Sequence, residues 1–151
     1  APEVWGRVVP KADVAVVDVA AADADNLAVT ALSLADPLPL VDAPAAVTAT
    51  VQNFGRSDKP GVRLELAVGK AAGGEAGLMP VEQRVLESVP AGQRVTVTFA
   101  LDGAARFRDP GVHLVRVRLV EPDALPADDS RALAVPVRAG LSAVPYSTWG
   151  A

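Results

Sequence analysis

His113 is the only histidine among the 151 residues, and it is the one side chain that could act as a general base near neutral pH. A catalytic histidine also needs a carboxylate that orients it and a nucleophile that it activates. Asp109 lies four residues earlier, and Ser88 or Ser130 could be the nucleophile, but no Gly-x-Ser-x-Gly turn frames either serine. His113 also alternates with valines two and four residues further on, as residues of one strand face do. A structural histidine near a strand start is therefore the favoured interpretation, and catalysis is the alternative.

Two groups of oxygen-bearing side chains could bind a divalent cation: Asp23, Asp25 and Asn26, and Asp123, Asp128 and Asp129. Calcium accepts clustered carboxylate and amide oxygens, and the candidate ligands for it are Asp23, Asp25, Asp128 and Asp129. Neither group has the glycine and the distal glutamate of an EF-hand loop. Aspartates in loops between strands are ordinary turn residues. Turn formation is the favoured interpretation, so we expect neither a metal nor another cofactor.

Three weaker patterns point to other chemistry. Four carboxylates could supply a glycosidase pair: Glu65, Glu82, Glu87 and Asp102. The glycine-rich run at 71–77 resembles a phosphate loop but lacks the Lys-Ser/Thr that follows in one. Four arginines could form an outward basic stripe: Arg84, Arg94, Arg116 and Arg118. A flexible hairpin tip and pairing of arginines with glutamates across strands are the favoured interpretations, so we expect no enzyme.

The composition excludes several classes of site and partner. The chain has no cysteine, so it has neither disulfides nor thiolate ligands, and a single histidine excludes a multi-histidine metal site. The net charge of −4 gives no sign of the basic face that nucleic-acid binders carry. No segment approaches the ~18–20 continuous apolar residues of a membrane span, because aspartates interrupt the apolar stretch at 14–51.

The elements that position these residues are predicted by an alternation of apolar and polar residues, which is typical of half-buried strands. It is clearest at residues 61–68, 94–101, 112–120 and 132–138. Weaker strand candidates are residues 14–19, 27–34, 47–53 and 81–89. The apolar faces predict one core: Val47, Val51, Val62, Leu64, Leu66, Val95, Val97, Phe99, Val115, Val117, Leu133 and Val135.

Turn-forming residues separate the predicted strands, because Gly, Pro, Asn and Asp concentrate between them. We assign structural turn roles to Asn53, Gly55, Gly111 and His113. Asn53 is expected to bond the backbone across its turn, and Gly55 is expected to take a positive φ.

Strands at near-regular spacing predict an immunoglobulin-like antiparallel β-sandwich of about seven or eight strands with Greek-key links. We divide the chain into a lead segment at 1–24, the sandwich at 25–139 and a C-terminal tail at 140–151.

The two ends of the chain carry its Trp and Tyr residues, and Trp5, Tyr146 and Trp149 are candidate interface residues. Residues 4–9 and 14–19 do not fit the alternation of the sandwich. We expect at least one of these segments to pair at a sheet edge, which gives a homodimer if that edge belongs to another copy.

A series of motifs resembles CARDB-type domains, which are bacterial and archaeal immunoglobulin-like adhesion modules. The motifs are a strand with Asn-x-Gly at 49–55, an alternating strand at 62–68, Pro-Ala-Gly-Gln at 90–93, Pro-Gly-Val-His at 110–113 and an Asp-rich close at 123–131. The resemblance implies a sandwich and a role in adhesion or scaffolding.

The closing motif departs from the family at one position. The family pattern is Asp-x-Leu-x-x-Asp-Asn-x-Arg, and this chain has Asp129 in place of the Asn. The resemblance covers roughly residues 26–138.

Residues 14–19 and 25–30 look like the junction between a von Willebrand A domain and such a sandwich in the large aerotolerance-type (Bat) membrane proteins of bacteria. The A domain's Asp-x-Ser-x-Ser metal motif is absent here, so no metal role is carried over.

These observations predict a non-enzymatic structural or protein-interaction module of a larger, membrane-anchored bacterial protein. Its partners would be another protein or neighbouring domains of the same chain. An extracytoplasmic location rests on the resemblance only. A carbohydrate- or cell-surface-binding module is the alternative, which a row of exposed aromatics on one sheet would favour. A small hydrolase is a second alternative, which a cleft with a carboxylate beside His113 would favour.

Overall fold

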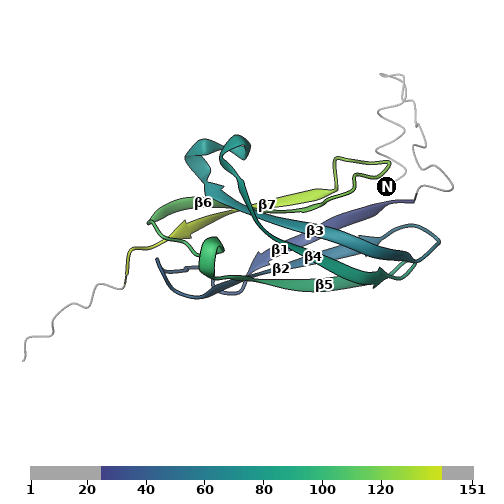
Figure 1. Cartoon of the computed structure of the whole chain (residues 1–151), viewed down its shortest axis with the longest axis horizontal. Helices are drawn as coiled ribbons and strands as arrows, with labels where there is room; N and C mark the ends of the chain where they lie inside the picture. The colour runs from purple at the N-terminus through teal and green to yellow at the C-terminus, as the bar shows by residue number, and fades with distance from the viewer. Residues whose placement is uncertain (1–24, 141–151) are drawn as a thin grey trace, which may run out of the picture.

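Two antiparallel β-sheets form the described part of the chain, which comprises residues 25–140 of a computed structural model (Figure 1). The strands are β1 (Leu27–Leu34), β2 (Ala45–Asn53), β3 (Lys59–Lys70), β4 (Met79–Val89), β5 (Arg94–Leu101), β6 (Gly111–Leu119) and β7 (Ser130–Val137). Short 3₁₀ turns lie at η1 (Ala71–Gly73), η2 (Glu75–Gly77) and η3 (Gly103–Ala105). The prediction of an all-β sandwich is therefore confirmed. The candidate strand at 14–19 lies outside the described residues.

The strand order identifies the type of sandwich. One sheet has the order β1-β2-β5 and the other has the order β4-β3-β6-β7. Because β2 neighbours β5 and β3 neighbours β6, the chain crosses between sheets as a Greek key does. The constant-type immunoglobulin domain adds its fourth strand to the sheet of the first two. Here β4 pairs with β3 instead, which gives a three-stranded and a four-stranded sheet.

The core lies between the inner faces of the two sheets, where their side chains interdigitate. All but two of the predicted core residues are buried there. Val95 and Leu133 are half-buried, because they lie on the edge strands β5 and β7, which have a neighbouring strand on one side only. Phe107 and Leu101 complete the core from the segments that follow and end β5.

The outer face of the three-stranded sheet is polar. On the three-stranded sheet, hydroxyl pairs join β2 to β5, with 3.2 Å between the Oγ1 atoms of Thr48 and Thr98 and 3.4 Å between those of Thr50 and Thr96. Such cross-strand pairs stabilise a sheet on its solvent side. Among the described residues, Phe54 is the one aromatic side chain with large exposure, and it lies in a loop.

The edge strand β4 is built against further strand pairing. Pro80 supplies no backbone N–H, and Glu82 and Arg84 form an ion pair of 2.6 Å. Arg84 lies opposite Leu64 in the register, and its guanidinium carbon is 5.7 Å from the ring centre of Phe99. Charged side chains on the inner side of an edge strand oppose the addition of another strand.

The chain traverses the sandwich from one end to the other, because each of the seven strands runs opposite to the one before it. Residues 25 and 140 therefore lie at opposite ends of the sandwich (Figure 1). We call the end at residue 25 the proximal end; it carries the β2–β3, β4–β5 and β6–β7 loops. The end at residue 140 is the distal end. Among residues 25–140, no helix is long and apolar enough to cross a membrane.

Asn53 organises the β2–β3 loop at the proximal end. Its amide nitrogen donates to the carbonyl oxygens of Ser57 at 2.8 Å and Val89 at 2.9 Å, and its Oδ1 accepts the N–H of Gly55 at 2.8 Å. The expectation of a positive φ at Gly55 is wrong. The glycines that have a positive φ are Gly61, Gly74, Gly92, Gly103 and Gly111. A Cβ at Gly55 would lie 3.0 Å from the Asn53 Oδ1 and 2.9 Å from the Asp25 Oδ1, so a larger residue would require these side chains to shift.

Candidate metal site at the proximal end

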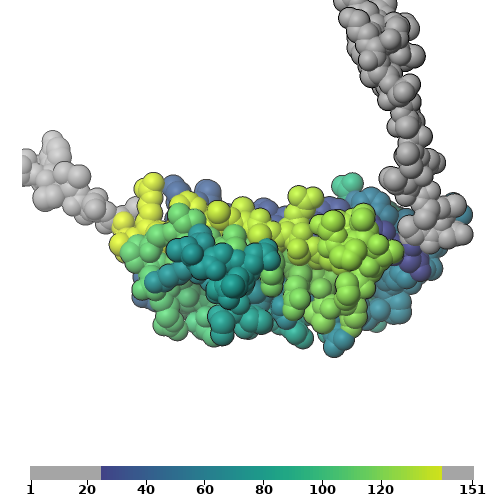
Figure 2. Space-filling model, turned by 90° about the horizontal axis from the view of Figure 1, so that it is seen from above, coloured from purple at the N-terminus to yellow at the C-terminus, as the bar shows by residue number. Residues whose placement is uncertain are grey.

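The β6–β7 loop, residues 120–129, folds against the start of β1. The Val29 N–H donates to the carbonyl of Asp128 at 2.9 Å, and the Leu119 N–H donates to that of Asp129 at 2.8 Å. Arg131 adds a bond from its Nε to the Val29 carbonyl at 2.9 Å. Figure 2 shows this yellow-green loop packed beside the start of the described chain. The loop and β1 are far apart in sequence, yet a backbone hydrogen bond between Val29 and Asp128 holds them together.

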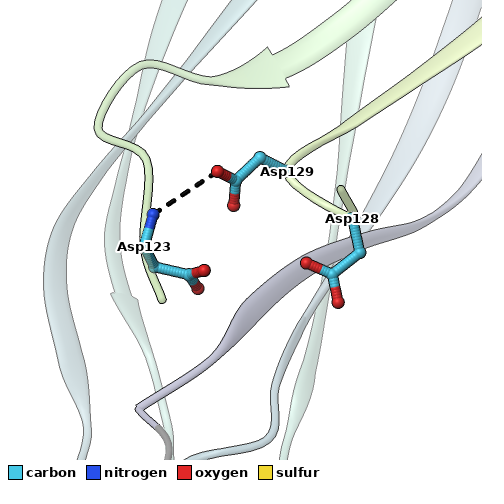
Figure 3. Close-up of side chains that lie close together, drawn as sticks. All are labelled: Asp123, Asp128 and Asp129. Atoms are coloured by element: carbon cyan, nitrogen blue, oxygen red, sulfur yellow. Dashed lines mark hydrogen bonds between the residues drawn. The ribbon is translucent and has the colours of Figure 1, made fainter. Parts of the chain in front are cut away.

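Three carboxylates of the loop converge in this corner. Asp123, Asp128 and Asp129 each offer an oxygen, and these three oxygens lie within 4.8 Å of one another. Figure 3 shows the three carboxylates turned toward a common space from two sides of the loop. Asp123 and Asp128 are half-buried and Asp129 is buried.

Donors within the corner orient the carboxylates without filling their capacity to accept. Asp123 accepts the Leu27 N–H at 2.5 Å and the Leu125 N–H at 2.8 Å. Asp128 accepts a bond of 3.0 Å from the side-chain amide of Asn26 at its Oδ2. Asp129 accepts only a long bond of 3.4 Å, from the Asp123 N–H to its Oδ2. Each bond uses one lone pair, and an ionised carboxylate has about four.

Three buried oxygens of the corner have no hydrogen-bond donor: the Oδ1 atoms of Asn26, Asp128 and Asp129. Asp129 is 6% exposed. Burial, and then the negative charges of Asp123 and Asp128, raise the pKa of the Asp129 carboxyl above its ordinary value, although the Asp123 N–H acts in the opposite sense. An uncompensated buried carboxylate destabilises the folded state unless a proton or a cation joins it.

Of the other predicted group, Asn26 joins this corner through its bond to Asp128, whereas Asp25 does not. Asp25 pairs with Lys59, with 2.9 Å between carboxylate and ammonium, and accepts the Ser57 hydroxyl at 3.4 Å. Lys59, through a hydrogen bond and its charge, holds the pKa of Asp25 below its ordinary value. Asp23 lies outside the described residues. The sequence grouped Asp123 with Asp128 and Asp129, although only the latter two were predicted as calcium ligands. The place of Asp123 in the corner depends on the fold of the loop.

His113 lies at the distal end, and its side-chain hydrogen bond within residues 25–140 is to a backbone carbonyl and not to a carboxylate. Its Nε2 is 2.8 Å from the backbone carbonyl oxygen of Asp109, and its ring centre is 5.0 Å from that of Phe107. The Asp109 carboxylate instead pairs with Lys70 at 3.1 Å.

Neither candidate nucleophile is near His113. The register places Ser130 opposite a residue of β6 five positions further on, which is about 16 Å along a strand. Ser88 lies opposite Pro60, ten positions along β3 from the partner of His113, or roughly 33 Å. The structure does not bring the three proposed catalytic residues together.

The remaining sequence candidates are dispersed. Glu65 points outward from β3 and binds Arg118 at 2.8 Å, whereas Glu82 lies opposite the inward Leu66, so these two carboxylates face different sides of one sheet. Arg118 bonding lowers the pKa of Glu65 more than burial raises it.

The four arginines do not form one stripe. Arg84 covers the core, Arg94 binds Gln52 on the three-stranded sheet at 2.9 Å, and Arg116 pairs with Glu75 at 3.3 Å. The interface candidates Trp5, Tyr146 and Trp149 lie outside the described residues.

Comparisons with solved structures agree on the fold. The CARDB domain of a Pyrococcus furiosus protein, whose crystal structure was determined in complex with di-metal ions, matches with a TM-score of 0.62 and 11% identity, over 80% of this chain and 100% of that one. A domain of a Methanosarcina acetivorans protein, named as a putative cell surface protein, matches with a TM-score of 0.53 and 19% identity, over 76% and 92% of the two chains.

An enzyme also contains a similar sandwich, as a small part of its chain. A β-glucosidase from Erythrobacter marinus matches with a TM-score of 0.59 and 11% identity, over 75% of this chain but only 15% of its own. No protein-family model matches the chain, and no curated protein matches its sequence. At these identities the likeness shows the fold, which is that of CARDB domains.

Proposed function

We propose that residues 25–139 form a non-enzymatic structural or protein-interaction module of a larger bacterial protein that acts outside the cytoplasm. The observation that carries the proposal is how much of each similar chain the sandwich covers. It covers nearly all of a CARDB domain and of a domain from a protein named as a putative cell surface protein, but only 15% of a β-glucosidase. A fold that recurs as a whole domain in one setting and as an accessory part in another is an exchangeable module.

The course of the chain supports a spacing role. Because residues 25 and 140 lie at opposite ends, flanking segments are held apart by the length of the sandwich (Figure 1). The longest strand, β3, has 12 residues and spans about 40 Å. A module of this kind extends a chain away from whatever precedes it. A preceding von Willebrand A domain, with residues 1–24 as the junction, is the arrangement that we propose for the parent protein.

The surroundings of His113 support the absence of catalysis. A general base needs an orienting partner and a substrate atom within hydrogen-bond reach. His113 is 6% exposed, and its Nε2 is engaged by a backbone carbonyl. The two serines that could act with it lie at remote positions of the sheet.

The location is tested by cysteine labelling in intact cells of the organism that makes the protein. The chain has no cysteine, so Thr96→Cys places a single thiol on the exposed face of β5. We expect a small, charged, membrane-impermeant maleimide to label it without lysis. Val97→Cys, one residue further and 9% exposed, is the matched control and should react only after denaturation. Labelling of Thr96→Cys only in lysed cells would place the module in the cytoplasm and refute the proposal.

A further inference from the structure

We propose that Asp123, Asp128 and Asp129 bind one calcium ion, which joins the β6–β7 loop to the start of β1. The proposal goes beyond a structural role for the module and does not depend on its location. It rests on the convergence of three carboxylates within 4.8 Å and on the state of Asp129. Figure 3 shows the Asp129 oxygen that lacks a donor directed into the space that the three carboxylates surround.

The state of Asp129 is what separates this corner from an ordinary acidic loop. The residue is only 6% exposed, and its Oδ1 has neither solvent nor a hydrogen-bond donor. Buried polar atoms in folded proteins are nearly always satisfied, so an unsatisfied one indicates a missing partner. The Oδ1 of Asp128 is in the same condition. A cation in the space between them satisfies both atoms at once.

The charges of the corner also call for a cation. Three carboxylates lie together, and the lysines and arginines that form ion pairs among residues 25–140 pair with other acids. Arg131 is near the corner in the chain, but its Nε is bonded to the carbonyl of Val29. Like charges this close in a partly buried place repel strongly unless a counter-charge lies between them.

The donor set selects calcium among the common cations. Every available donor is an oxygen, and neither imidazole nor thiolate is present, which disfavours zinc. Calcium takes six to eight oxygens at about 2.3–2.6 Å, so two ligands on opposite sides of the ion are up to about 5 Å apart. The separation of the three carboxylate oxygens falls within that limit. Magnesium holds its ligands at about 2.0–2.1 Å in a strict octahedron, which this spread of oxygens fits less well.

Asn26 links the corner to the start of β1. Its amide nitrogen donates to Asp128, and its own Oδ1 is buried without a donor. Waters would complete the ligand shell. The ion would then be held by the β6–β7 loop, whose carboxylates also accept bonds from Asn26 and Leu27, so its loss would loosen the contact between the loop and the start of β1.

The test uses the full 151-residue chain after removal of cations with a chelator. Titration with calcium chloride is followed by calorimetry, and thermal unfolding is followed by circular dichroism. We expect a dissociation constant of about 0.1–1 mM, as in calcium-binding extracellular modules. At 10 mM calcium we expect the unfolding midpoint to rise by roughly 5 °C, from linkage to the folded state. In nitrogen-15 spectra, the amides of Leu27, Asp123 and Asp129 should shift first.

Matched variants locate the site. Asp129→Asn and Asp128→Asn each remove one charge at constant shape, and each should weaken calcium binding at least tenfold. Without calcium, Asp129→Asn should unfold at a higher temperature than the wild type, because it removes an uncompensated buried charge; this shows that the variant is folded. Asp25→Asn is the control, since Asp25 lies outside the corner and pairs with Lys59. It should bind calcium as the wild type does.

Several outcomes overturn the proposal. The site does not exist if 10 mM calcium produces neither heat nor a shift of the midpoint. It is elsewhere if Asp129→Asn keeps the full response or Asp25→Asn loses it. It is not a calcium site if magnesium chloride at the same concentration raises the midpoint equally.

Discussion

Replacing Asn53 with alanine should destabilise the sandwich by about 3 kcal/mol. The side chain has no solvent exposure and makes three hydrogen bonds with the backbone, to Ser57, Val89 and Gly55. A hydrogen bond inside a folded protein contributes about 1 kcal/mol net, so three contribute about 3 kcal/mol. The bond to Val89 is buried, so water cannot easily replace it. The bond to Ser57 is half-buried, and water can replace it. The expected range is therefore about 2–4 kcal/mol.

Urea unfolding of the full chain, followed by circular dichroism, measures this loss. The slope m should stay at the wild-type value, and the midpoint should fall by more than about 1 M urea. Gln52→Ala is the matched control: its side chain binds Arg94 on the outer face, and it should cost less than about 1 kcal/mol. A loss at Asn53 no larger than that at Gln52 would mean that the turn does not depend on these bonds, and the assignment of Asn53 as a structural residue would be wrong.

Three further substitutions test the core, an ion pair and a turn. Val97→Asp places a charge at a position that is 9% exposed and should lower the free energy of unfolding by at least about 3 kcal/mol. A urea midpoint equal to that of the wild type would mean that Val97 was assigned to the wrong face of β5. Glu65→Gln tests the bond with Arg118, which lowers the pKa of Glu65. The stabilisation from this bond exists above the pKa of Glu65 in the unfolded chain and is lost as the pH falls through its pKa in the folded protein, so the wild type should be more stable than the variant at pH 7 and lose that advantage below about pH 4. A stability difference that stays constant across that range would exclude a stabilising role for the bond. Gly111→Ala puts a side chain on a φ of +118° and should cost about 1–3 kcal/mol, whereas Gly73→Ala, at a position with open space, should cost less than about 1 kcal/mol in the same assay.

The alternation of apolar and polar residues predicted the sandwich well because burial on one face is a local property of a strand. The segments expected at 61–68 and 94–101 correspond to β3 and β5. The inward residues of these strands are those that the alternation assigned to the core. Among the predicted core residues, the expected burial is incomplete at Val95 and Leu133, which lie on the edge strands β5 and β7.

The partner of β4 could not be predicted in the same way. Its sequence suits the edge of either sheet, because its burial is low along most of its length and only Val89 is fully buried. What places β4 beside β3 is the short connection through η1 and η2, which returns the chain next to the strand that it left. Arg84, which the sequence offered for an outward stripe or for pairing with a glutamate, pairs with Glu82 and lies over Phe99 of the core.

The candidate metal corner shows a similar limit. The sequence groups Asp123 with the adjacent Asp128 and Asp129, but it does not show that the three carboxylates converge. Asp123 joins them only because the loop folds back, through bonds from its carboxylate to the N–H groups of Leu125 and Leu27. Asp25 was an equally good candidate ligand by residue type, but it forms an ion pair with Lys59 at the start of β3.

Asn26 connects the two polar networks of the proximal end, which explains why a cation in the corner should affect more than its ligands. Its backbone carbonyl accepts the Phe54 N–H at 2.8 Å, next to the Asn53 turn, while its side chain donates to Asp128. The backbone N–H of Asn53 in turn donates to Gln93 of the β4–β5 loop at 3.0 Å. All three loops of this end are therefore tied to the segment through which the chain enters the sandwich. An ion held by Asp123, Asp128 and Asp129 would fix that segment directly and the other loops through it, so the module would be stiffest where it meets whatever precedes it.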